Sequence, residues 1–199
     1  MLKINSKAPN FNLVSTNGSS YSLKNSIGKY VVLYFYPRDD TPGCTIETND
    51  FNKLLPKFKK LNCEIFGISK DDLKSHHKFK EKFKIKFDLL SDVELNILKK
   101  YKVWAKKKFM GREFMGIVRT TFLIDPNGKI VKINTEQLKK NINEICNTIL
   151  DYLNNKEHDK ITFFNDCIDI KNYKIQIINN LLGKLNKIIK CICRFNIPE

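Results

Sequence analysis

The sequence predicts an α/β fold in which a parallel-dominated sheet is covered by helices. Short runs of β-branched, aromatic and aliphatic residues alternate along the chain with segments whose apolar residues recur every three or four positions. Such alternation is typical of strand–helix–strand units and therefore of a parallel sheet. With 199 residues, 42% of them hydrophobic, the chain is long enough for one domain with a sizeable core and an appendage. We place the domain at residues 1–154 and the appendage at residues 155–199.

The first third of the domain contains a predicted hairpin, a central strand and a helix. Short extended pieces flank an Asn-Gly turn at residues 17–18, which is a hairpin signal. Residues 30–36 are almost continuously apolar, as expected for a central strand that is buried on both faces. A helix is predicted over residues 45–61, since four apolar side chains recur there at helical spacing: Phe51, Leu54, Leu55 and Phe58.

Two more strand–helix pairs follow. Residues 63–69 are predicted to form a short apolar strand. The segment Ser69-Lys70-Asp71-Asp72 at its end provides a cap for a helix that runs to about residue 83. Residues 87–92 form another short strand and a turn. Residues 93–102 are expected to be helical, with three side chains directed inward: Leu95, Leu98 and Tyr101.

The last third of the domain begins with a segment that we predict to be a basic loop, residues 103–118. Residues 119–131 then form a hairpin around an Asn-Gly turn. A terminal helix is predicted over residues 135–154, with one apolar face made of Leu138, Ile142, Ile145, Ile149 and Leu153.

The appendage consists of a polar linker and an amphipathic helix. The linker spans residues 154–160, and the helix carries a stripe at 4-3-4-3 spacing: Ile178, Leu182, Leu185, Ile189 and Ile192. A stripe of this kind must be covered. Docking on the domain, self-association, and a membrane or partner surface are all open alternatives, and we expect a monomer or a weak homodimer.

The chain is strongly basic, with a formal net charge of +15. Residues 1–150 hold 28 Lys and Arg against 15 Asp and Glu, so the excess lies in the domain and not in the appendage. Within residues 53–108 the numbers are 17 and 7. Such a surface attracts nucleic acid or other anionic partners in a salt-sensitive way. The alternative is an ordinary solvated, lysine-rich face.

Cysteine usage and hydropathy indicate the compartment. Six cysteines without paired spacing suit a reducing environment, and no Cys-x-x-Cys or Cys/His cluster indicates a dithiol or a metal site. No apolar run reaches the roughly 18 residues of a transmembrane helix, and the N-terminus has no secretory pattern. These features predict an intracellular protein, cytoplasmic or nuclear, without a membrane span.

One stretch between the central strand and the first long helix carries the chemistry. After Phe35-Tyr36-Pro37 the chain reads Thr41-Pro42-Gly43-Cys44-Thr45-Ile46-Glu47, so that a single cysteine stands where the helix begins. A thiol there faces unpaired backbone N–H groups and the positive end of the helix dipole, and both favour the thiolate. Thr41 can offer a hydroxyl to the same small volume. A buried cysteine without chemistry is the alternative.

This stretch resembles the active-site signature of the peroxiredoxins. Within that family it is most similar to the peroxiredoxin Q, or bacterioferritin comigratory protein, group, and the resemblance covers about residues 4–154. It implies a thioredoxin-like fold, with a central mixed sheet flanked by helices. The C-terminal amphipathic helical extension lies outside the resemblance.

The resemblance also implies a reaction and its residues. The Cys44 thiolate would attack hydrogen peroxide or an alkyl hydroperoxide and become a sulfenic acid. Thr41 would orient the peroxide, and Arg119, just before a strand, would stabilise the thiolate and the developing oxygen charge. The supporting residues are Gly43, Pro37 and Glu47. The N–H group of Gly43 would face the site together with that of Cys44, and Glu47 would hold the arginine. No metal, haem or flavin is implied.

The sequence departs from the group's pattern in one respect. Many peroxiredoxin Q proteins carry a resolving cysteine five residues after the reactive one, and here that position is Asn49. We therefore expect a one-cysteine enzyme that is reduced by glutathione, glutaredoxin or thioredoxin. Resolution by another cysteine of the chain stays open, the candidates being Cys63, Cys146, Cys167, Cys191 and Cys193.

Two functions from other classes remain. The protein could be a redox sensor whose Cys44 is oxidised once without turnover. It could also be a nucleic-acid-associated protein that uses the basic surface of residues 53–108, with Cys44 as a protective thiol.

Overall fold

The computed structural model describes residues 2–109, 111–135 and 146–156. The chain divides into two compact units, Met1–Asn154 and Asn155–Glu199. The predicted appendage falls almost wholly outside the described residues, as do Leu138, Ile142 and Ile145 of the predicted terminal helix. No helix within the described ranges is long and apolar enough to cross a membrane.

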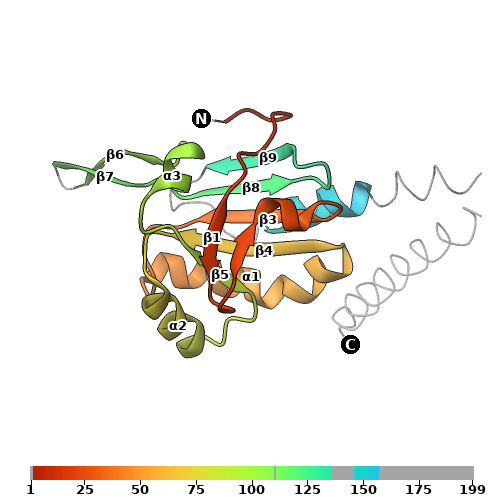
Figure 1. The fold of residues 1–199 in the computed structure, drawn as a ribbon. Coiled ribbons are helices and arrows are strands. Elements are labelled where there is room, and N and C mark those ends of the chain that lie inside the picture. The colour runs from red at the N-terminus through yellow and green to blue at the C-terminus, as the bar shows by residue number, and fades with distance from the viewer. Residues whose placement is uncertain (1, 110, 136–145, 157–199) are drawn as a thin grey trace, which may run out of the picture. The chain divides into compact units, whose positions relative to one another are not determined.

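A seven-stranded mixed sheet forms the centre of the first unit, with the strand order β2-β1-β5-β4-β3-β8-β9 (Figure 1). Its strands are β1 Asn12–Ser15, β2 Ser20–Ser22, β3 Tyr30–Phe35, β4 Cys63–Ser69, β5 Asp88–Ser91, β8 Thr120–Ile124 and β9 Ile130–Thr135. The helices are the 3₁₀ turn η1 Leu23–Ser26, α1 Pro42–Lys60, α2 Leu73–Lys82 and α3 Asn96–Lys100. The expected mixed sheet with flanking helices is confirmed.

The expectation that parallel pairs dominate the sheet is wrong. Only β3–β4 and β4–β5 are parallel, and they are the pairs that a helix connects. The other four pairs, β1–β2, β1–β5, β3–β8 and β8–β9, are antiparallel. Tight turns join β1 to β2 and β8 to β9, and a tight turn permits only antiparallel neighbours.

Strand β3 divides the core in two because its side chains alternate between the faces of the sheet. Val32 and Tyr34 face a cluster that includes Phe51, Leu55 and Phe58 of α1, which we call the α1-side core. The intervening β3 residues face a second cluster, the α3-side core, together with Phe11, Ile97, Leu98 and Tyr101.

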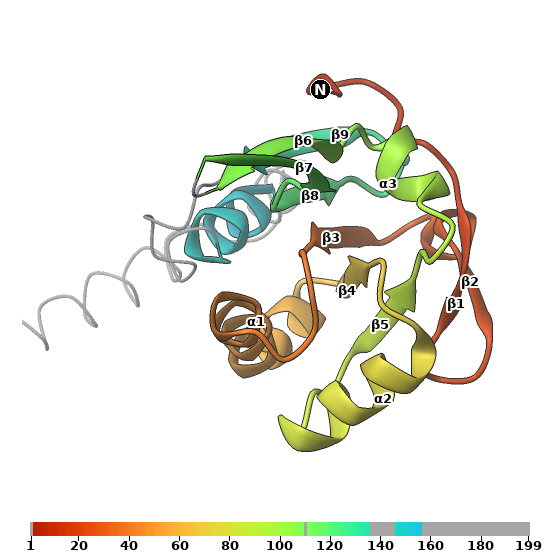
Figure 2. The ribbon, with the colours of Figure 1, turned by 90° about the vertical axis from the view of Figure 1, so that its left-hand side faces the viewer.

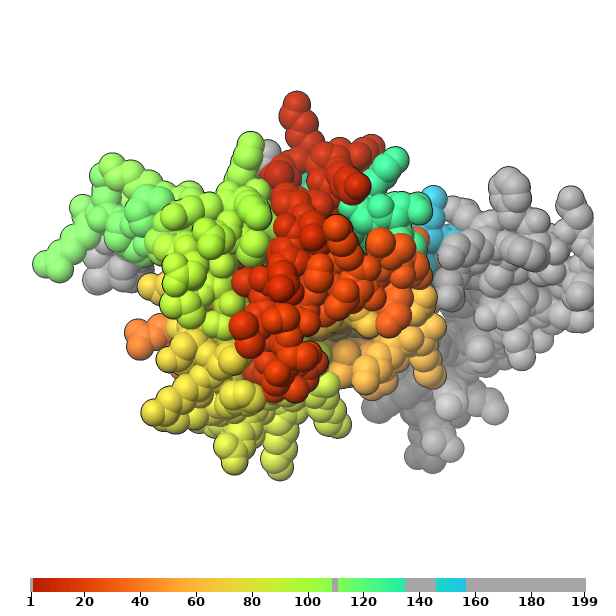
Figure 3. Space-filling model, in the orientation of Figure 1, coloured from red at the N-terminus to blue at the C-terminus, as the bar shows by residue number. Residues whose placement is uncertain are grey.

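The two cores correspond to the two layers that cover the sheet. Figure 2 shows α1 and α2 on one side of β3, β4 and β5, and α3 on the other. The space-filling view shows the N-terminal segment and the β1–β2 hairpin running across the face that Figure 1 turns to the viewer (Figure 3). The strand β3 is therefore shielded from water on both faces, as its apolar run predicts.

The segment that we predicted to be a basic loop is a hairpin. Strands β6 (Trp104–Phe109) and β7 (Arg112–Ile117) pair in a separate two-stranded sheet that extends away from the main sheet at the left of Figure 1. Gly111, with φ of +79°, provides the left-handed turn. Three consecutive lysines hide the alternation that usually identifies a strand, because their long side chains tolerate either face.

Two helices differ from their predicted bounds. Helix α1 begins at Pro42, three residues earlier than expected, because proline is well suited to a first helical position. Helix α3 is shorter than predicted, since Leu95 adopts a left-handed conformation with φ of +60° and so precedes the helix. Leu98 and Tyr101 are buried as expected, Leu95 is partly buried against the α3-side core, and Ile97 is buried there as well.

The described part of the last helix begins at Cys146, and its residues up to Leu153 pack against the α1-side core. Ile149, Leu150 and Leu153 are buried there, and so is Cys146. This helix and α1 thus cover the same face of the sheet, in agreement with the predicted apolar positions 149 and 153.

Candidate active site

The candidate site lies at the loop that connects β3 to α1. The strand ends at Phe35, and Pro37 follows two residues later, where a residue without an N–H group suits the end of sheet pairing. Thr41 is the N-cap of α1, with extended backbone angles of φ −102° and ψ 150°. Cys44 is consequently the third residue of the helix and lies in its first turn.

The register of the sheet brings Arg119 to Cys44. Phe35 at the end of β3 pairs with Thr120 at the start of antiparallel β8, so the residue before Thr120 lies beside the loop that leads to the cysteine. In this position Nη2 of Arg119 lies 3.2 Å from Sγ of Cys44. The thiol is almost completely buried, with 1% of its surface exposed. A positive charge at this distance stabilises a thiolate.

Glu47 holds the same guanidinium. It lies three residues after Cys44 on α1, which places both side chains on one face of the helix. Its carboxylate accepts a hydrogen bond from Nη1 of Arg119 and forms an ion pair with it. Glu47 is 1% exposed, so this buried carboxylate needs the arginine as its partner. The pair fixes the guanidinium while Nη2 contacts the sulfur.

The N-terminus of α1 adds backbone donors to the site. The first intrahelical hydrogen bond joins the N–H group of Thr45 to the carbonyl of Thr41, at 2.8 Å. The N–H groups of Gly43 and Cys44 precede it and have no acceptor within the helix. The hydroxyl of Thr41 does not cap the helix; it donates to the carbonyl of Arg38, at 3.1 Å.

A buried tyrosine lies below the helix. Tyr34 of β3 is fully buried, stacks on Phe51 of α1, and shares a hydrogen bond of 3.1 Å with the hydroxyl of Thr48. Burial raises the pKa of Tyr34 far above its usual value, so the phenol stays neutral. Gly67 on β4 leaves room for this ring, since a Cβ there would lie 2.5 Å from the tyrosine oxygen.

The other two cysteines within the described ranges, Cys63 and Cys146, are buried free thiols in the α1-side core. Burial raises the pKa of Cys63 far above its usual value. Burial, together with the charge of Asp50, raises the pKa of Cys146 to about 12. Neither thiol is ionised at neutral pH in this structure. Cys167, Cys191 and Cys193 lie outside the described residues.

The structure thus joins three of the predicted site residues directly, Cys44, Arg119 and Glu47. Thr41 and Gly43 belong to the helix start on which the cysteine lies. Two buried residues were not predicted from the sequence: Asp39, which lies in the loop, and His76, which lies on α2. The signal for His76 is its place on α2, three residues before buried Phe79, where a polar residue interrupts an apolar stripe.

Comparison with known proteins identifies the family. The profile of the AhpC/TSA family matches residues 4–133, about two thirds of the chain. A peroxiredoxin Bcp of Bacillus subtilis is 42% identical over 151 residues, which are 75% of this chain and 96% of that protein. The chain belongs to the AhpC/TSA family. It is a peroxiredoxin, similar to the Bcp and peroxiredoxin Q proteins, and hence a thiol-dependent peroxidase, an oxidoreductase.

Solved structures agree with this assignment. The bacterioferritin comigratory protein of Xanthomonas campestris, described for its alkyl peroxide reduction activity, superposes on this peroxiredoxin with a TM-score of 0.67. The two are 35% identical over 73% of this chain and 91% of that one. A yeast mitochondrial one-cysteine peroxiredoxin, described for thiol resolution through the glutathione and thioredoxin systems, gives a TM-score of 0.63. It is 32% identical over 75% of each chain.

Proposed function

We propose that this peroxiredoxin reduces hydrogen peroxide and alkyl hydroperoxides at Cys44, and that an external thiol regenerates the cysteine. The contact of 3.2 Å between Nη2 of Arg119 and Sγ of Cys44 carries this proposal. Arg119 is itself held by buried Glu47, so the positive charge is in place before a peroxide arrives. Such preorganised charge stabilises a transition state without reorganisation during the reaction.

The first half-reaction transfers an oxygen atom to sulfur. The Cys44 thiolate attacks one oxygen of the peroxide, an S–O bond forms, and the O–O bond breaks with its electron pair on the departing oxygen. That oxygen takes up a proton and leaves as water or an alcohol. The peroxide is reduced by two electrons, and Cys44 becomes a sulfenic acid.

Three sets of donors and acceptors serve this step. The guanidinium of Arg119 and the N–H groups of Gly43 and Cys44 stabilise negative charge on sulfur and on the departing oxygen. The hydroxyl of Thr41 uses its hydrogen for the Arg38 carbonyl, so its oxygen lone pairs are available to accept the O–H group of a peroxide. Thr41 thereby orients the substrate.

The second half-reaction removes the sulfenic oxygen with two thiols. The first thiol attacks the sulfenic sulfur, water leaves, and a mixed disulfide forms. The second thiol attacks that disulfide and releases Cys44. Glutathione, glutaredoxin and thioredoxin can supply these thiols. The described resolution of the yeast one-cysteine relative through glutathione and thioredoxin systems supports an external thiol here.

The β3–β4 register argues against Cys63 as an internal resolving group. Cys63 pairs with Tyr30 at the start of β3, whereas Cys44 follows the far end of that strand at Phe35. Five steps of about 3.3 Å separate the two ends, or about 16 Å. Cys146 is fully buried, and its neutral thiol is a poor nucleophile. Resolution by either one requires partial unfolding.

Trapping the oxidised cysteine tests both halves of the proposal. One equivalent of peroxide should yield a protein in which dimedone labels Cys44 and peptide mapping finds no intramolecular disulfide. The Cys44→Ser variant should take up no dimedone. A mapped disulfide between Cys44 and any other cysteine of the chain, including Cys167, Cys191 and Cys193, would replace the one-cysteine mechanism with a two-cysteine one.

The nucleic-acid hypothesis stays a prediction, and the lysines of α2 give it little support. Lys78 and Lys82 lie one turn apart on the same face of α2, whereas Lys80 points to roughly the opposite side, so the spacing by two does not place all three on one face. Lys80 pairs with Asp88, and Lys82 pairs with Asp40. The Bcp relatives are bacterial proteins and give no support to a nuclear location. A cytoplasmic location stays a prediction.

A further inference from the structure

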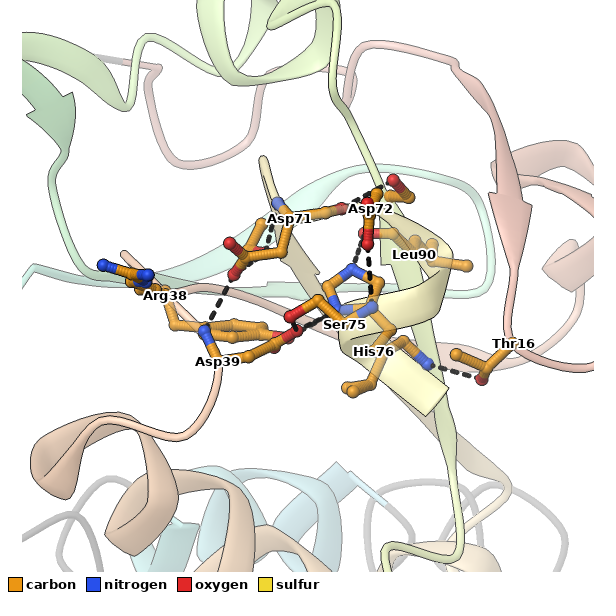
Figure 4. Close-up of polar contacts among 12 residues, drawn as sticks. Thr16, Arg38, Asp39, Asp71, Asp72, Ser75, His76 and Leu90 are labelled. Atoms are coloured by element: carbon orange, nitrogen blue, oxygen red, sulfur yellow. Dashed lines mark hydrogen bonds and ion pairs between the residues drawn. The ribbon is translucent and has the colours of Figure 1, made fainter. Parts of the chain in front are cut away.

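The loop before Cys44 is fastened by a buried carboxylate that the reaction itself does not use. Both oxygens of Asp39 are engaged: Oδ1 accepts the hydroxyl of Tyr36 at 2.7 Å, and Oδ2 accepts the hydroxyl of Ser75 at 2.7 Å. Oδ2 also lies 2.8 Å from Nδ1 of His76. Ser75 and His76 belong to α2, and the separation in sequence is 36 and 37 residues (Figure 4).

His76 is placed between two acceptors. It is completely buried, with Nδ1 facing the Asp39 carboxylate and Nε2 lying 3.3 Å from the carbonyl oxygen of Leu90 on β5. The ring therefore lies between the loop, through Asp39, and β5, through Leu90, while its own backbone belongs to α2.

The backbone of Asp39 is held as firmly as its side chain. Its N–H group donates to Oδ2 of Asp71, at 2.8 Å. Asp71 is itself held by two hydroxyls. That of Ser69, at the end of β4, donates to Oδ2 of Asp71 at 2.9 Å, and that of Ser91, at the end of β5, donates to its carbonyl oxygen at 2.6 Å. The carboxyl ends of two sheet strands thus anchor this peptide.

That anchored peptide is the one to which Thr41 is hydrogen-bonded. The N–H group of Asp39 and the carbonyl of Arg38 belong to one planar peptide unit, so fixing the first orients the second. The carbonyl of Arg38 accepts the Thr41 hydroxyl at 3.1 Å. A continuous chain of contacts therefore leads from α2 and the ends of β4 and β5 to the hydroxyl beside the reactive cysteine.

We propose that Asp39 and His76 are positioning residues for the peroxidase reaction: they fix the peptide between residues 38 and 39 and, through it, the hydroxyl of Thr41 that receives the peroxide. This inference rests on the proposed function. It assigns a task to a buried Asp–His pair that lies outside the contacts made by Cys44, Arg119 and Glu47.

The charges around the pair are consistent with this task. Although burial alone would raise the pKa of Asp39, the hydrogen bond and positive charge of His76 and the hydroxyls of Tyr36 and Ser75 lower it below its ordinary value. Tyr36 stays neutral, because burial raises its pKa. A second ion pair, from Lys82 at the end of α2 to Asp40, holds the next residue of the same loop at 2.6 Å.

The test compares two reactions of Cys44 in His76→Gln. Oxidation by peroxide needs Thr41 in place, whereas alkylation by iodoacetamide needs only a reactive sulfur, whose surroundings of Arg119 and the α1 N-terminus are unchanged. We expect the rate constant for oxidation to fall by about 10- to 100-fold, because small misplacements of a substrate-orienting group cost this much. The alkylation rate should stay at its wild-type value. His77→Gln, an exposed neighbour on α2, is the matched control and should behave as wild type in both reactions.

Each outcome decides the matter. If His76→Gln is folded and is oxidised as fast as wild type, or if oxidation and alkylation fall together, the positioning role is wrong. If His76→Gln does not fold, Ser75→Ala removes a single donor to Asp39 and should show the same selective loss, only smaller. An unchanged oxidation rate in that variant overturns the inference. A wild-type protein whose Cys44 does not react with peroxide would instead overturn the proposed function.

Discussion

Arg119 performs two tasks with one guanidinium. Nη1 satisfies the buried carboxylate of Glu47, and Nη2 reaches the sulfur of Cys44. The planar fork of an arginine allows both contacts at once, whereas a lysine offers a single point charge on a flexible stem. The function of this single residue therefore depends on the shape of its side chain as well as on its charge.

Arg119→Lys should keep the fold and lose most of the activity. The lysine can still pair with Glu47, but it then no longer contacts the sulfur. We expect Cys44 oxidation to slow by about 100- to 1,000-fold, the usual effect of removing one stabilising donor from a transition state. Stopped-flow measurement of the oxidation rate checks this. Arg112→Lys, at an exposed position on β7, is the control, and wild-type speed in Arg119→Lys would contradict the role given to the arginine.

Among the secondary-structure elements, the junction of β3 and α1 explains both where the site lies and why residue 49 could resolve Cys44 only after unwinding. The loop follows β3, Cys44 lies in the first turn of α1, and Arg119 directly precedes β8, which pairs with β3. Asn49 stands on α1 five residues after Cys44, so its side chain points about 140° away from the cysteine around the helix. A cysteine at that position could reach Cys44 only if the first turns of α1 unwind.

Asn49→Cys tests whether α1 can unwind in this way. After one equivalent of peroxide, we expect a disulfide between residues 44 and 49 in the variant and none to Cys44 in the wild type. Thioredoxin should then reduce the variant faster than the wild-type sulfenic acid, because an exchangeable disulfide has formed. Peptide mapping by mass spectrometry provides the readout. A stable sulfenic acid at Cys44 of the variant would show that α1 stays folded during the reaction.

Gly67 tests the packing beneath the site. A Cβ at this position would lie 2.5 Å from the Tyr34 oxygen, 2.6 Å from its ring carbon Cζ and 2.9 Å from Cδ2 of Leu89. Gly67→Ala should therefore lower the free energy of unfolding by about 1–3 kcal/mol. Gly116→Ala on β7 is the control, since its Cβ would meet only side-chain atoms at 3.2 Å or more. Equal urea midpoints for both variants would refute this view of the β3–β4 packing.

The sequence predicts the site better than it predicts the elements around it. Thr41, Cys44 and Glu47 belong to one local motif, and the strand before them is continuously apolar, so short-range information suffices. The β6–β7 hairpin was not predicted, because its consecutive lysines show no alternation of polar and apolar residues. The contact of Asp39 with His76 spans 37 residues and depends on how α2 docks, which no local pattern encodes.

At the scale of the whole molecule, the buried pair of Asp39 and His76 links the fold to pH. The pKa of Asp39 is lower in the folded protein than its ordinary value of 3.8. Its ionised form therefore contributes stability that is fully present above that value and is lost as the pH falls through the lower, folded-state pKa. The acid limb of the stability curve should carry this signature.

Urea unfolding of wild type and Asp39→Asn across the acid range measures that contribution. We expect the wild type to be the more stable protein at neutral pH and the difference to shrink as the pH drops below 3.8. Asp125→Asn, at a turn residue between β8 and β9, controls for the loss of a carboxylate elsewhere. A difference that stays constant or grows towards low pH would mean that Asp39 is not ionised and paired in the native state.

Peroxide consumption by wild type and by Cys44→Ser is the most direct test of the whole account. Each protein is assayed with glutathione and glutaredoxin, and separately with thioredoxin and thioredoxin reductase. We predict continuous turnover by the wild type with at least one of the two systems and none by Cys44→Ser. Turnover that persists in Cys44→Ser would contradict the assignment of Cys44. Oxidation of the wild type that stops after one equivalent with both systems would indicate a redox sensor in place of a peroxidase.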